Sequence, residues 1–142
     1  MSGLSVTRRY HFSAGHRLEN AALSPEDNAR LYGPCHRQHG HNYLVEVTVA
    51  GPLDPMTGMS VDLAAVDATV RAVLLDRVDH YDLSATVAEL AGVVTTGENL
   101  ARLFWQWLEA ALPPGQLRRL TVIETENNVF EYCGESAPRG DA

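Results

Sequence analysis

Three histidines with the spacing of metal ligands are the most chemically informative residues of this chain. His16 ends the segment FSAGH, and His39 and His41 stand two residues apart in the segment CHRQHGH at positions 35–41. Three neutral imidazoles bind a metal ion and leave one coordination position open, which is typical of catalytic rather than structural sites. Zinc is the metal most often held in this way, although iron, cobalt or nickel would also fit. The pattern therefore predicts a zinc-dependent enzyme.

The two neighbouring histidines also have the spacing of one strand face. His39 and His41 share the parity of Tyr43 and Val45, so all four side chains are expected on the apolar face of a strand. A lone histidine there would most often be a core residue with its hydrogen bonds satisfied. Two imidazoles in an apolar surface need a partner, because buried polar groups without one are costly. His16 ends the preceding predicted strand, so antiparallel pairing would bring it to the same place.

A cysteine and an Asp-His pair supply groups that could move protons near such a metal. Cys35 lies four residues before His39, and a nearby dication would favour its thiolate, which suits proton abstraction or nucleophilic attack; an ordinary buried thiol is the alternative. Asp79-His80 is a possible general acid–base unit, in which the carboxylate orients the imidazole. A histidine favoured by a helix C-terminus is an equally good explanation of His80. We therefore predict Cys35, Asp79 and His80 as catalytic candidates.

A carboxylate near the C-terminus is expected to point toward the core. Glu124 shares the parity of Leu120 and Val122 on a predicted strand. A buried carboxylate is costly unless it is paired. It could accept two N–H bonds from a flat heterocycle that carries an amino group beside a ring nitrogen, whereas a structural ion pair is the alternative.

The elements around these residues follow the order strand, strand, helix, helix, strand, strand. Alternating apolar residues predict strands over 6–14, 39–50, 117–125 and 129–133, with a polar loop over 19–34. Helical spacing predicts one helix from an N-cap at Asp62 to about residue 78. A second helix begins with a capping box of Thr95 and Glu98 and stops before Pro113. The pattern predicts an α+β fold, a four-stranded antiparallel sheet with two helices on one face.

Length and composition favour a single globular domain. The 142 residues are long enough for one core, so the chain is expected to form one domain, 1–142, with a frayed tail from about residue 136. The net charge of −7 argues against a nucleic-acid partner, because phosphate backbones require basic surface. No apolar run approaches the roughly 18–20 residues of a membrane span, and the N-terminus lacks the apolar segment of a secretory signal. We expect a cytoplasmic protein with no membrane partner.

In their order and combination these motifs resemble the 6-pyruvoyltetrahydropterin synthase / 6-carboxytetrahydropterin synthase family. The resemblance extends from residue 12 to residue 134. The matching segments are FSAGHRL at 12–18, C at 35 with HGHNY at 39–43, DH at 79–80 with L at 83, TTGENLA at 95–101, and ET at 124–125.

The resemblance implies a fold, a site and an assembly. The fold would be the tunnelling fold, or T-fold, in which subunits join their sheets into a barrel and commonly form a homohexamer of two trimers. Zinc would lie on the three histidines, and Cys35 would act as the base on the side chain of a pterin triphosphate substrate. Asp79 and His80 would be relay partners at a subunit interface. Glu124 would anchor the pterin, assisted by Thr95 or Thr96.

The spacer between the cysteine and the histidines bears on which reaction is expected. The pattern C-x3-H-G-H is similar to bacterial carboxy-forming enzymes, whereas mammalian-type pyruvoyl-forming enzymes typically carry a longer spacer. The segment at 124–132 looks closer to the pyruvoyl-forming enzymes. From the spacer we expect a lyase that converts 7,8-dihydroneopterin triphosphate to 6-carboxy-5,6,7,8-tetrahydropterin, acetaldehyde and triphosphate, in the queuosine pathway.

Three alternatives stay open. Pyruvoyl formation for tetrahydrobiopterin synthesis would use every residue named above and differ only in the fate of the substrate side chain. Aldolase-like cleavage of dihydroneopterin is a second, but variants of that kind often carry glutamate where this chain has Cys35. A non-catalytic metal- or pterin-binding module is a third, and the retained Cys35, Asp79 and His80 argue against it.

Overall fold

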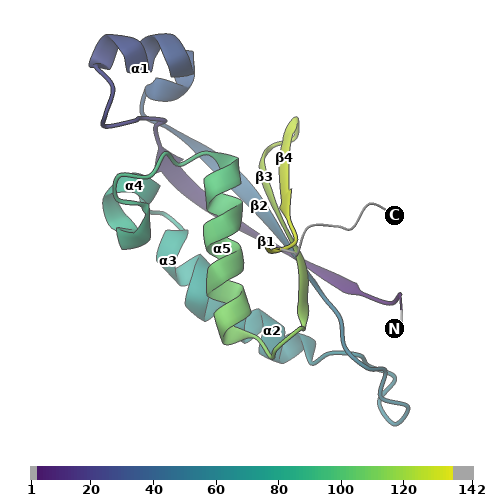
Figure 1. The fold of residues 1–142 in the computed structure, drawn as a ribbon. Coiled ribbons are helices and arrows are strands. Elements are labelled where there is room, and N and C mark those ends of the chain that lie inside the picture. The colour runs from purple at the N-terminus through teal and green to yellow at the C-terminus, as the bar shows by residue number, and fades with distance from the viewer. Residues whose placement is uncertain (1–2, 136–142) are drawn as a thin grey trace.

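The core of the fold is one antiparallel sheet. The structure, a computed structural model, describes residues 3–135; the tail predicted to fray lies outside this range. Four strands, β1 (Val6–His16), β2 (His39–Val49), β3 (Leu117–Thr125) and β4 (Asn128–Tyr132), lie side by side in chain order (Figure 1). The predicted four-stranded antiparallel sheet is therefore confirmed.

The pairing of β1 with β2 aligns the residues that matter for the site. Phe12 pairs with Tyr43, and two steps further along, Ala14 pairs with His41. The strand β1 continues past its predicted end at residue 14, because β2 still offers partners there, and so His16 pairs with His39. Residues that are directly opposite in an antiparallel pair have Cβ atoms roughly 4.5–5.5 Å apart. The register alone therefore gathers the three histidines at one end of the sheet.

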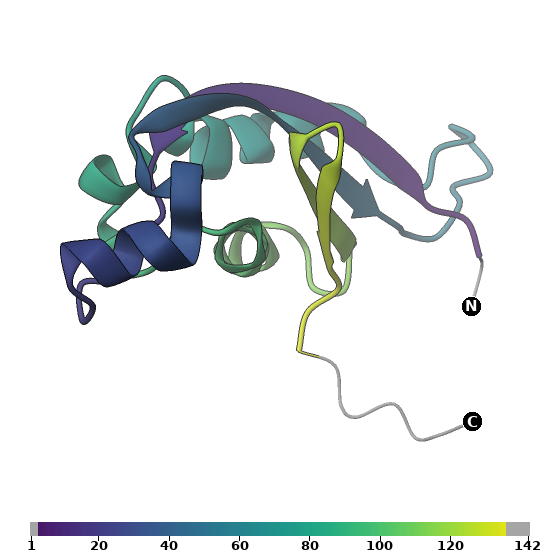
Figure 2. The ribbon, with the colours of Figure 1, turned by 90° about the horizontal axis from the view of Figure 1, so that it is seen from above.

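Two helical segments cover one face of the sheet. The first is α2 (Leu63–Val70), a π-helical turn η2 (Arg71–Leu75) and α3 (Asp76–Val78), and the second is α5 (Gly97–Ala111). Seen from above, both segments lie on the same side of the curved sheet (Figure 2). Fully buried side chains from β2 and α5 form the core between them, including Tyr43, Val45, Leu100, Phe104 and Leu108.

The first helix begins as predicted but is not a uniform α-helix. The side chain of Asp62 accepts a hydrogen bond from the backbone N–H of Ala65 and caps α2. Along the segment, the fully or almost fully buried residues recur every four positions: Val66, Val70, Leu74 and Val78. Four residues of an α-helix advance about 40° beyond one turn, so the apolar face drifts. The wider π-helical turn counteracts that drift, which keeps these residues on the sheet.

Four short helical elements were not predicted. The loop expected over 19–34 contains α1 (Pro25–Tyr32), which is followed by the 3₁₀ turn η1 (Gly33–His36). Ser24 caps α1 by accepting from the backbone N–H of Asp27, and proline occupies the first turn, so the start signal was present in the sequence. In both views α1 stands away from the sheet (Figures 1 and 2). The elements α4 (Leu83–Thr86) and η3 (Ala88–Leu90) follow α3.

The start of α5 corrects one detail of the predicted capping box. Thr96, not Thr95, is the N-cap, because its hydroxyl accepts from the backbone N–H of Asn99. Thr95 is instead completely buried. Among residues 3–135, no helix has the length and apolarity that crossing a membrane requires.

Candidate functional site

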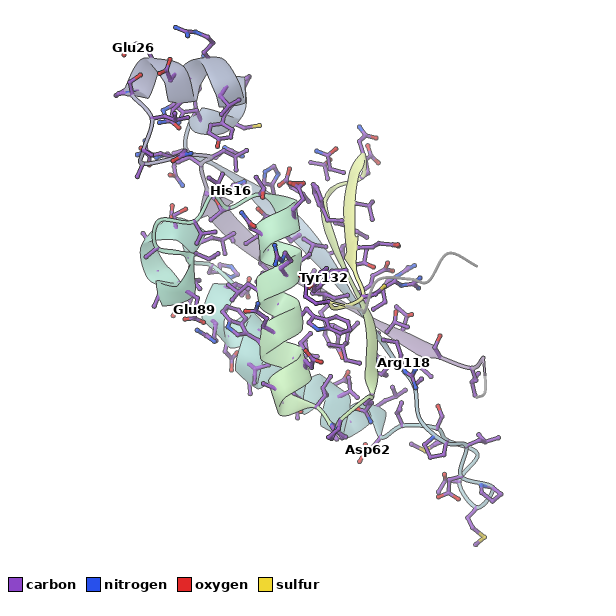
Figure 3. The ribbon with its side chains drawn as sticks, viewed as in Figure 1. His16, Glu26, Asp62, Glu89, Arg118 and Tyr132 are labelled. Atoms are coloured by element: carbon purple, nitrogen blue, oxygen red, sulfur yellow. The ribbon has the colours of Figure 1, made fainter. Side chains whose placement is uncertain are left out.

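The three predicted metal ligands lie together. One potential ligand atom from each of His16, His39 and His41 falls within 4.8 Å of the other two. The three ring centroids are 4.6–5.1 Å apart. His16 is 1% exposed and lies at the N-terminal end of α5 (Figure 3). We call this trio the histidine cluster.

Main-chain carbonyl groups orient two rings of the histidine cluster. Nδ1 of His16 lies 3.0 Å from the carbonyl oxygen of Thr95, and Nδ1 of His39 lies 2.6 Å from the carbonyl oxygen of Arg37. A carbonyl oxygen only accepts, so each Nδ1 must carry the proton and donate it. Each Nε2 then keeps its lone pair. This is the arrangement in which histidines bind metals, with the other ring nitrogen held by an acceptor.

The electrostatics of the histidine cluster also fit a metal ion. Burial, together with the nearby charges of His39 and His41, lowers the pKa of His16 to about 4, so its ring is neutral at pH 7. Burial likewise lowers the pKa of His41. Nε2 of His41 is buried and has no hydrogen-bond partner among the described residues. A bound cation would satisfy that atom, so the residues present fit a metal held by three imidazoles, without deciding which metal.

Glu124 lies beside the histidine cluster. Its Oε1 is 4.0 Å from Nε2 of His41, and its side chain is 15% exposed. The inward orientation predicted from its parity is therefore correct. The negative charge of Glu124 adds to burial in raising the pKa of Tyr43, whose hydroxyl lies 3.4 Å from Nε2 of His16. The histidine cluster, a carboxylate and a phenol thus share one corner of the sheet.

Asp79 and His80 form a hydrogen-bonded pair on the surface. Nδ1 of His80 lies 2.9 Å from Oδ1 of Asp79. The contact is possible because His80 has a φ of +67°, an unusual conformation for a non-glycine residue that turns the chain sharply after α3. Two hydrogen bonds to Ser13 hold the turn: His80 N–H donates to the Ser13 carbonyl over 2.6 Å, and Ser13 N–H donates to the Asp79 carboxylate over 3.0 Å. The Ser13 N–H and the His80 ring lower the pKa of Asp79.

The exposure of the predicted catalytic residues differs sharply from that of the histidine cluster. The His80 side chain is 82% exposed, and the Cys35 thiol is exposed on η1. Cys35 does not belong to the group of ligand atoms formed by the described residues. Its segment is held through the backbone, where the Cys35 carbonyl accepts from Leu18 N–H over 2.8 Å. Its role as a base stays a prediction.

The two threonines predicted to contact the substrate are both engaged within the protein. The hydroxyl of Thr95 lies 3.1 Å from Nδ1 of His16, and that of Thr96 caps α5. Sequence reasoning treated them as interchangeable, because a threonine pair before a helix does not reveal which side chain faces inward. A contact between either threonine and a substrate stays a prediction.

A cavity of about 470 Å³ joins parts of both regions. Its lining includes His41 from the histidine cluster and His80 from the surface pair. Gln38 and Asp82 also line it, and the Gln38 amide donates to the Asp82 carboxylate over 2.7 Å. Sequence reasoning missed both residues. Asp82 carries a recognisable signal, since it caps α4 through the N–H of Ala85, whereas Gln38 carries none.

The chain is similar to known proteins over most of its length. Residues 5–135 match the family model described as 6-pyruvoyl tetrahydropterin synthase. The human 6-pyruvoyl tetrahydrobiopterin synthase is 44% identical over 132 residues, which cover 92% of this chain and 91% of the human protein. The 6-carboxy-5,6,7,8-tetrahydropterin synthase of Aquifex aeolicus is 26% identical over 159 residues, covering 92% and 98%.

A solved structure gives the same result for the fold. The 6-pyruvoyl tetrahydropterin synthase of Caenorhabditis elegans superposes with a TM-score of 0.88 at 36% identity, covering 92% of this chain and 95% of that one. The predicted α+β tunnelling fold is therefore confirmed.

Proposed function

The chain belongs to the 6-pyruvoyl tetrahydropterin synthase family of lyases, and we propose that it converts 7,8-dihydroneopterin triphosphate to 6-pyruvoyltetrahydropterin and triphosphate. The observation that carries the proposal is the histidine cluster with Glu124 beside it, a metal-binding geometry next to a single inward carboxylate. The reaction needs a metal to act on the hydroxyl groups of the substrate side chain and a group that holds the heterocycle.

The pyruvoyl-forming reaction is favoured over the carboxy-forming reaction expected from the short spacer. Over alignments that each cover 92% of this chain, identity is 44% to the human pyruvoyl-forming protein and 26% to the carboxy-forming protein of Aquifex aeolicus. The spacer is a weaker guide because residues 33–36 form the turn η1, whose cysteine is exposed. A length change there alters the surface around Cys35 while the strand pairing of His39 and His41 persists.

We assign the metal site to the histidine cluster and propose zinc as its metal. A divalent metal bound there supplies Lewis acidity toward the hydroxyl groups of the substrate side chain. His16 and His39 are already held in the ligating tautomer by carbonyl groups, so little reorganisation is needed when the metal binds.

Glu124 is proposed to anchor the pterin. Its two oxygens can accept from the ring N–H and the amino group of the heterocycle, and its burial makes those hydrogen bonds stronger than they would be in water. The anchored edge of the ring would then lie beside His41, whose Nε2 is 4.0 Å from Oε1 of Glu124. The carboxylate would thus orient the substrate rather than react with it.

Proton transfer is proposed for Cys35, Asp79 and His80. The Cys35 thiolate would remove a proton from the substrate side chain. Asp79 fixes the Nδ1–H tautomer of His80 over 2.9 Å, which leaves Nε2 free to exchange a proton on the exposed side. In the overall reaction two hydrogens move from the side chain to the pterin ring and triphosphate leaves as its C–O bond breaks. No external oxidant or reductant is needed.

The exposure of these groups supports a homo-oligomer, for which we propose a hexamer of two trimers with sites at subunit interfaces. A proton-transfer group that is 82% exposed is poorly placed to exclude water. In addition, β1 and β4 are the outer strands of the sheet, and outer strands offer unpaired backbone groups to another chain. A second copy could cover the exposed groups and pair those edges together.

Product identification tests the proposal. The zinc-loaded protein is incubated with 7,8-dihydroneopterin triphosphate, and the products are separated and identified by mass spectrometry, with acetaldehyde measured in parallel. The expected result is 6-pyruvoyltetrahydropterin with equimolar triphosphate and no acetaldehyde.

Two other outcomes would revise the proposal in different ways. Carboxytetrahydropterin with acetaldehyde would reverse the choice of reaction while keeping the site. No turnover, in protein shown to contain one metal per chain, would overturn the proposed substrate.

A further inference from the structure

Thr95 is a completely buried polar residue next to the histidine cluster. It has no measurable exposure, and it directly precedes the residue that caps α5. Its carbonyl oxygen and its hydroxyl oxygen lie 3.0 Å and 3.1 Å from the same atom, Nδ1 of His16. Both acceptors of one residue therefore converge on one ring nitrogen.

The carbonyl and the hydroxyl of Thr95 both have hydrogen-bond partners within the protein. Because the carbonyl requires a proton on Nδ1 of His16, the hydroxyl must accept from that same proton. The hydroxyl proton of Thr95 is in turn directed to the carbonyl of Arg17 over 3.4 Å. The Thr95 hydroxyl therefore accepts from the His16 ring and donates to the main-chain carbonyl of Arg17, the residue after His16. Neither function leaves a proton for an external molecule.

We propose that Thr95 is a positioning residue for His16, which keeps the ring in the Nδ1–H tautomer and directs Nε2 to the metal, and that it is not a contact to the pterin. The inference rests on the metal site of the proposed function and deepens it. The two neighbouring threonines would then have different roles, because Thr96 caps α5.

His39 provides an internal comparison for this role. Its Nδ1 is held by the Arg37 carbonyl, a main-chain group that no substitution removes. His16 has a main-chain acceptor and a side-chain acceptor, and only the second can be deleted by mutation. Removal of partners behind metal ligands typically weakens metal binding 10- to 100-fold. Since the carbonyl remains, we expect the lower end, about 10-fold.

The test compares three variants with the wild-type protein. Thr95→Val keeps the shape and deletes the hydroxyl, and Thr95→Ser restores the hydroxyl. Thr96→Ala removes the neighbouring helix cap and serves as the matched control. Each metal-free protein is titrated with zinc in competition with a chromophoric chelator of known affinity, and its thermal unfolding is recorded without metal.

If Thr95 positions His16, loss of the Thr95 hydroxyl should change zinc affinity, and the substitution at Thr96 should change only stability. Thr95→Val should bind zinc about 10-fold more weakly, and Thr95→Ser should return to within about twofold of wild type. Thr96→Ala should lower the unfolding temperature without changing zinc affinity. If Thr95→Val unfolds earlier but binds zinc as wild type does, Thr95 is only structural and the inference is overturned. The product assay is unaffected by that result, so the proposed function would still stand.

A second measurement needs no variant of Thr95. Nitrogen-15 NMR of the imidazole rings in the metal-free wild-type protein reports which ring nitrogen of His16 carries the proton, with His16→Gln used to assign the signals. The expected result is a protonated Nδ1 before zinc is added, and a shift confined to Nε2 afterwards. A ring protonated at Nε2 in the metal-free protein would overturn the proposal.

Discussion

The histidine cluster and the surface pair of Asp79 and His80 are built by opposite means. In the first, the least exposed ligand is 1% exposed and carbonyl groups hold two of the three rings. In the second, the imidazole is 82% exposed and depends on a sharply turned backbone. The three candidate metal ligands thus lie together within one chain, whereas the proposed proton-transfer groups lie open.

The difference has a physical reason. A metal site needs neutral ligands at fixed distances, and burial together with carbonyl acceptors behind the rings supplies both within one sheet corner. Proton transfer needs groups that meet the substrate and exclude water, and an open surface does not exclude water. The second requirement points to a further chain, which is why the comparison can be tested at the level of assembly.

The largest expected effect is the loss of the metal when a ligand is removed. In His41→Ala two ligands remain, and zinc affinity should fall by more than about 100-fold, beyond the range seen when a hydrogen-bond partner behind a ligand is removed. Metal content after dialysis, measured by elemental analysis, checks this. His11→Ala, a change at an exposed histidine of the same sheet, should keep one metal per chain. Full metal content in His41→Ala would remove the histidine cluster as the metal site.

The next effect separates chemistry from metal binding. Cys35→Ala should lower kcat by roughly 100- to 10,000-fold, the range typical of losing a general base, while the protein keeps its metal. Cys133→Ala changes the other exposed cysteine and should leave turnover unchanged. The measurement is steady-state product formation alongside metal analysis. Equal rates for the two variants would exclude Cys35 as the base.

A mixing experiment asks whether the exposed groups work across subunits. Cys35→Ala and His80→Ala are each expected to be nearly inactive alone. If a site takes Cys35 from one chain and His80 from another, mixing and reassembling the two variants restores activity, because some sites then contain both intact groups. If activity does not return while mixed oligomers form, both groups act from the same chain, and the contrast between the two regions needs another explanation.

The smallest expected effect concerns stability and pH. The Ser13 N–H and the His80 ring lower the pKa of Asp79, so the carboxylate stabilises the fold above its unfolded pKa of about 3.8. That contribution should be lost as the pH falls through the lower, folded-state pKa. Asp79→Asn should destabilise the protein by about 0.5 kcal/mol at pH 7, as for exposed ion pairs.

Urea unfolding at a series of pH values checks this expectation. The difference in the free energy of unfolding between Asp79→Asn and wild type should become smaller below about pH 3.8. A difference that is constant from pH 7 to acid would mean that shape, not charge, accounts for the role of Asp79.

The parts predicted well are those that depend on local periodicity. Strand alternation placed His39, His41 and Glu124 on the inward face, and the structure agrees. Local signals were also missed or misplaced. Ser24-Pro25 marked the helix α1 within a stretch expected to be a loop, and the N-cap of α5 fell one residue later than expected.

The amino-acid sequence by itself determined the strands, the inward parity and the kinds of ligand, because side-chain alternation is a property of each strand alone. Only the tertiary structure decided which groups meet. The register of β1 with β2 set His16 opposite His39, and the packing of the α5 start against β1 turned Thr95 onto His16. Those contacts join residues up to 79 positions apart in the chain, and they depend on packing that no local pattern encodes.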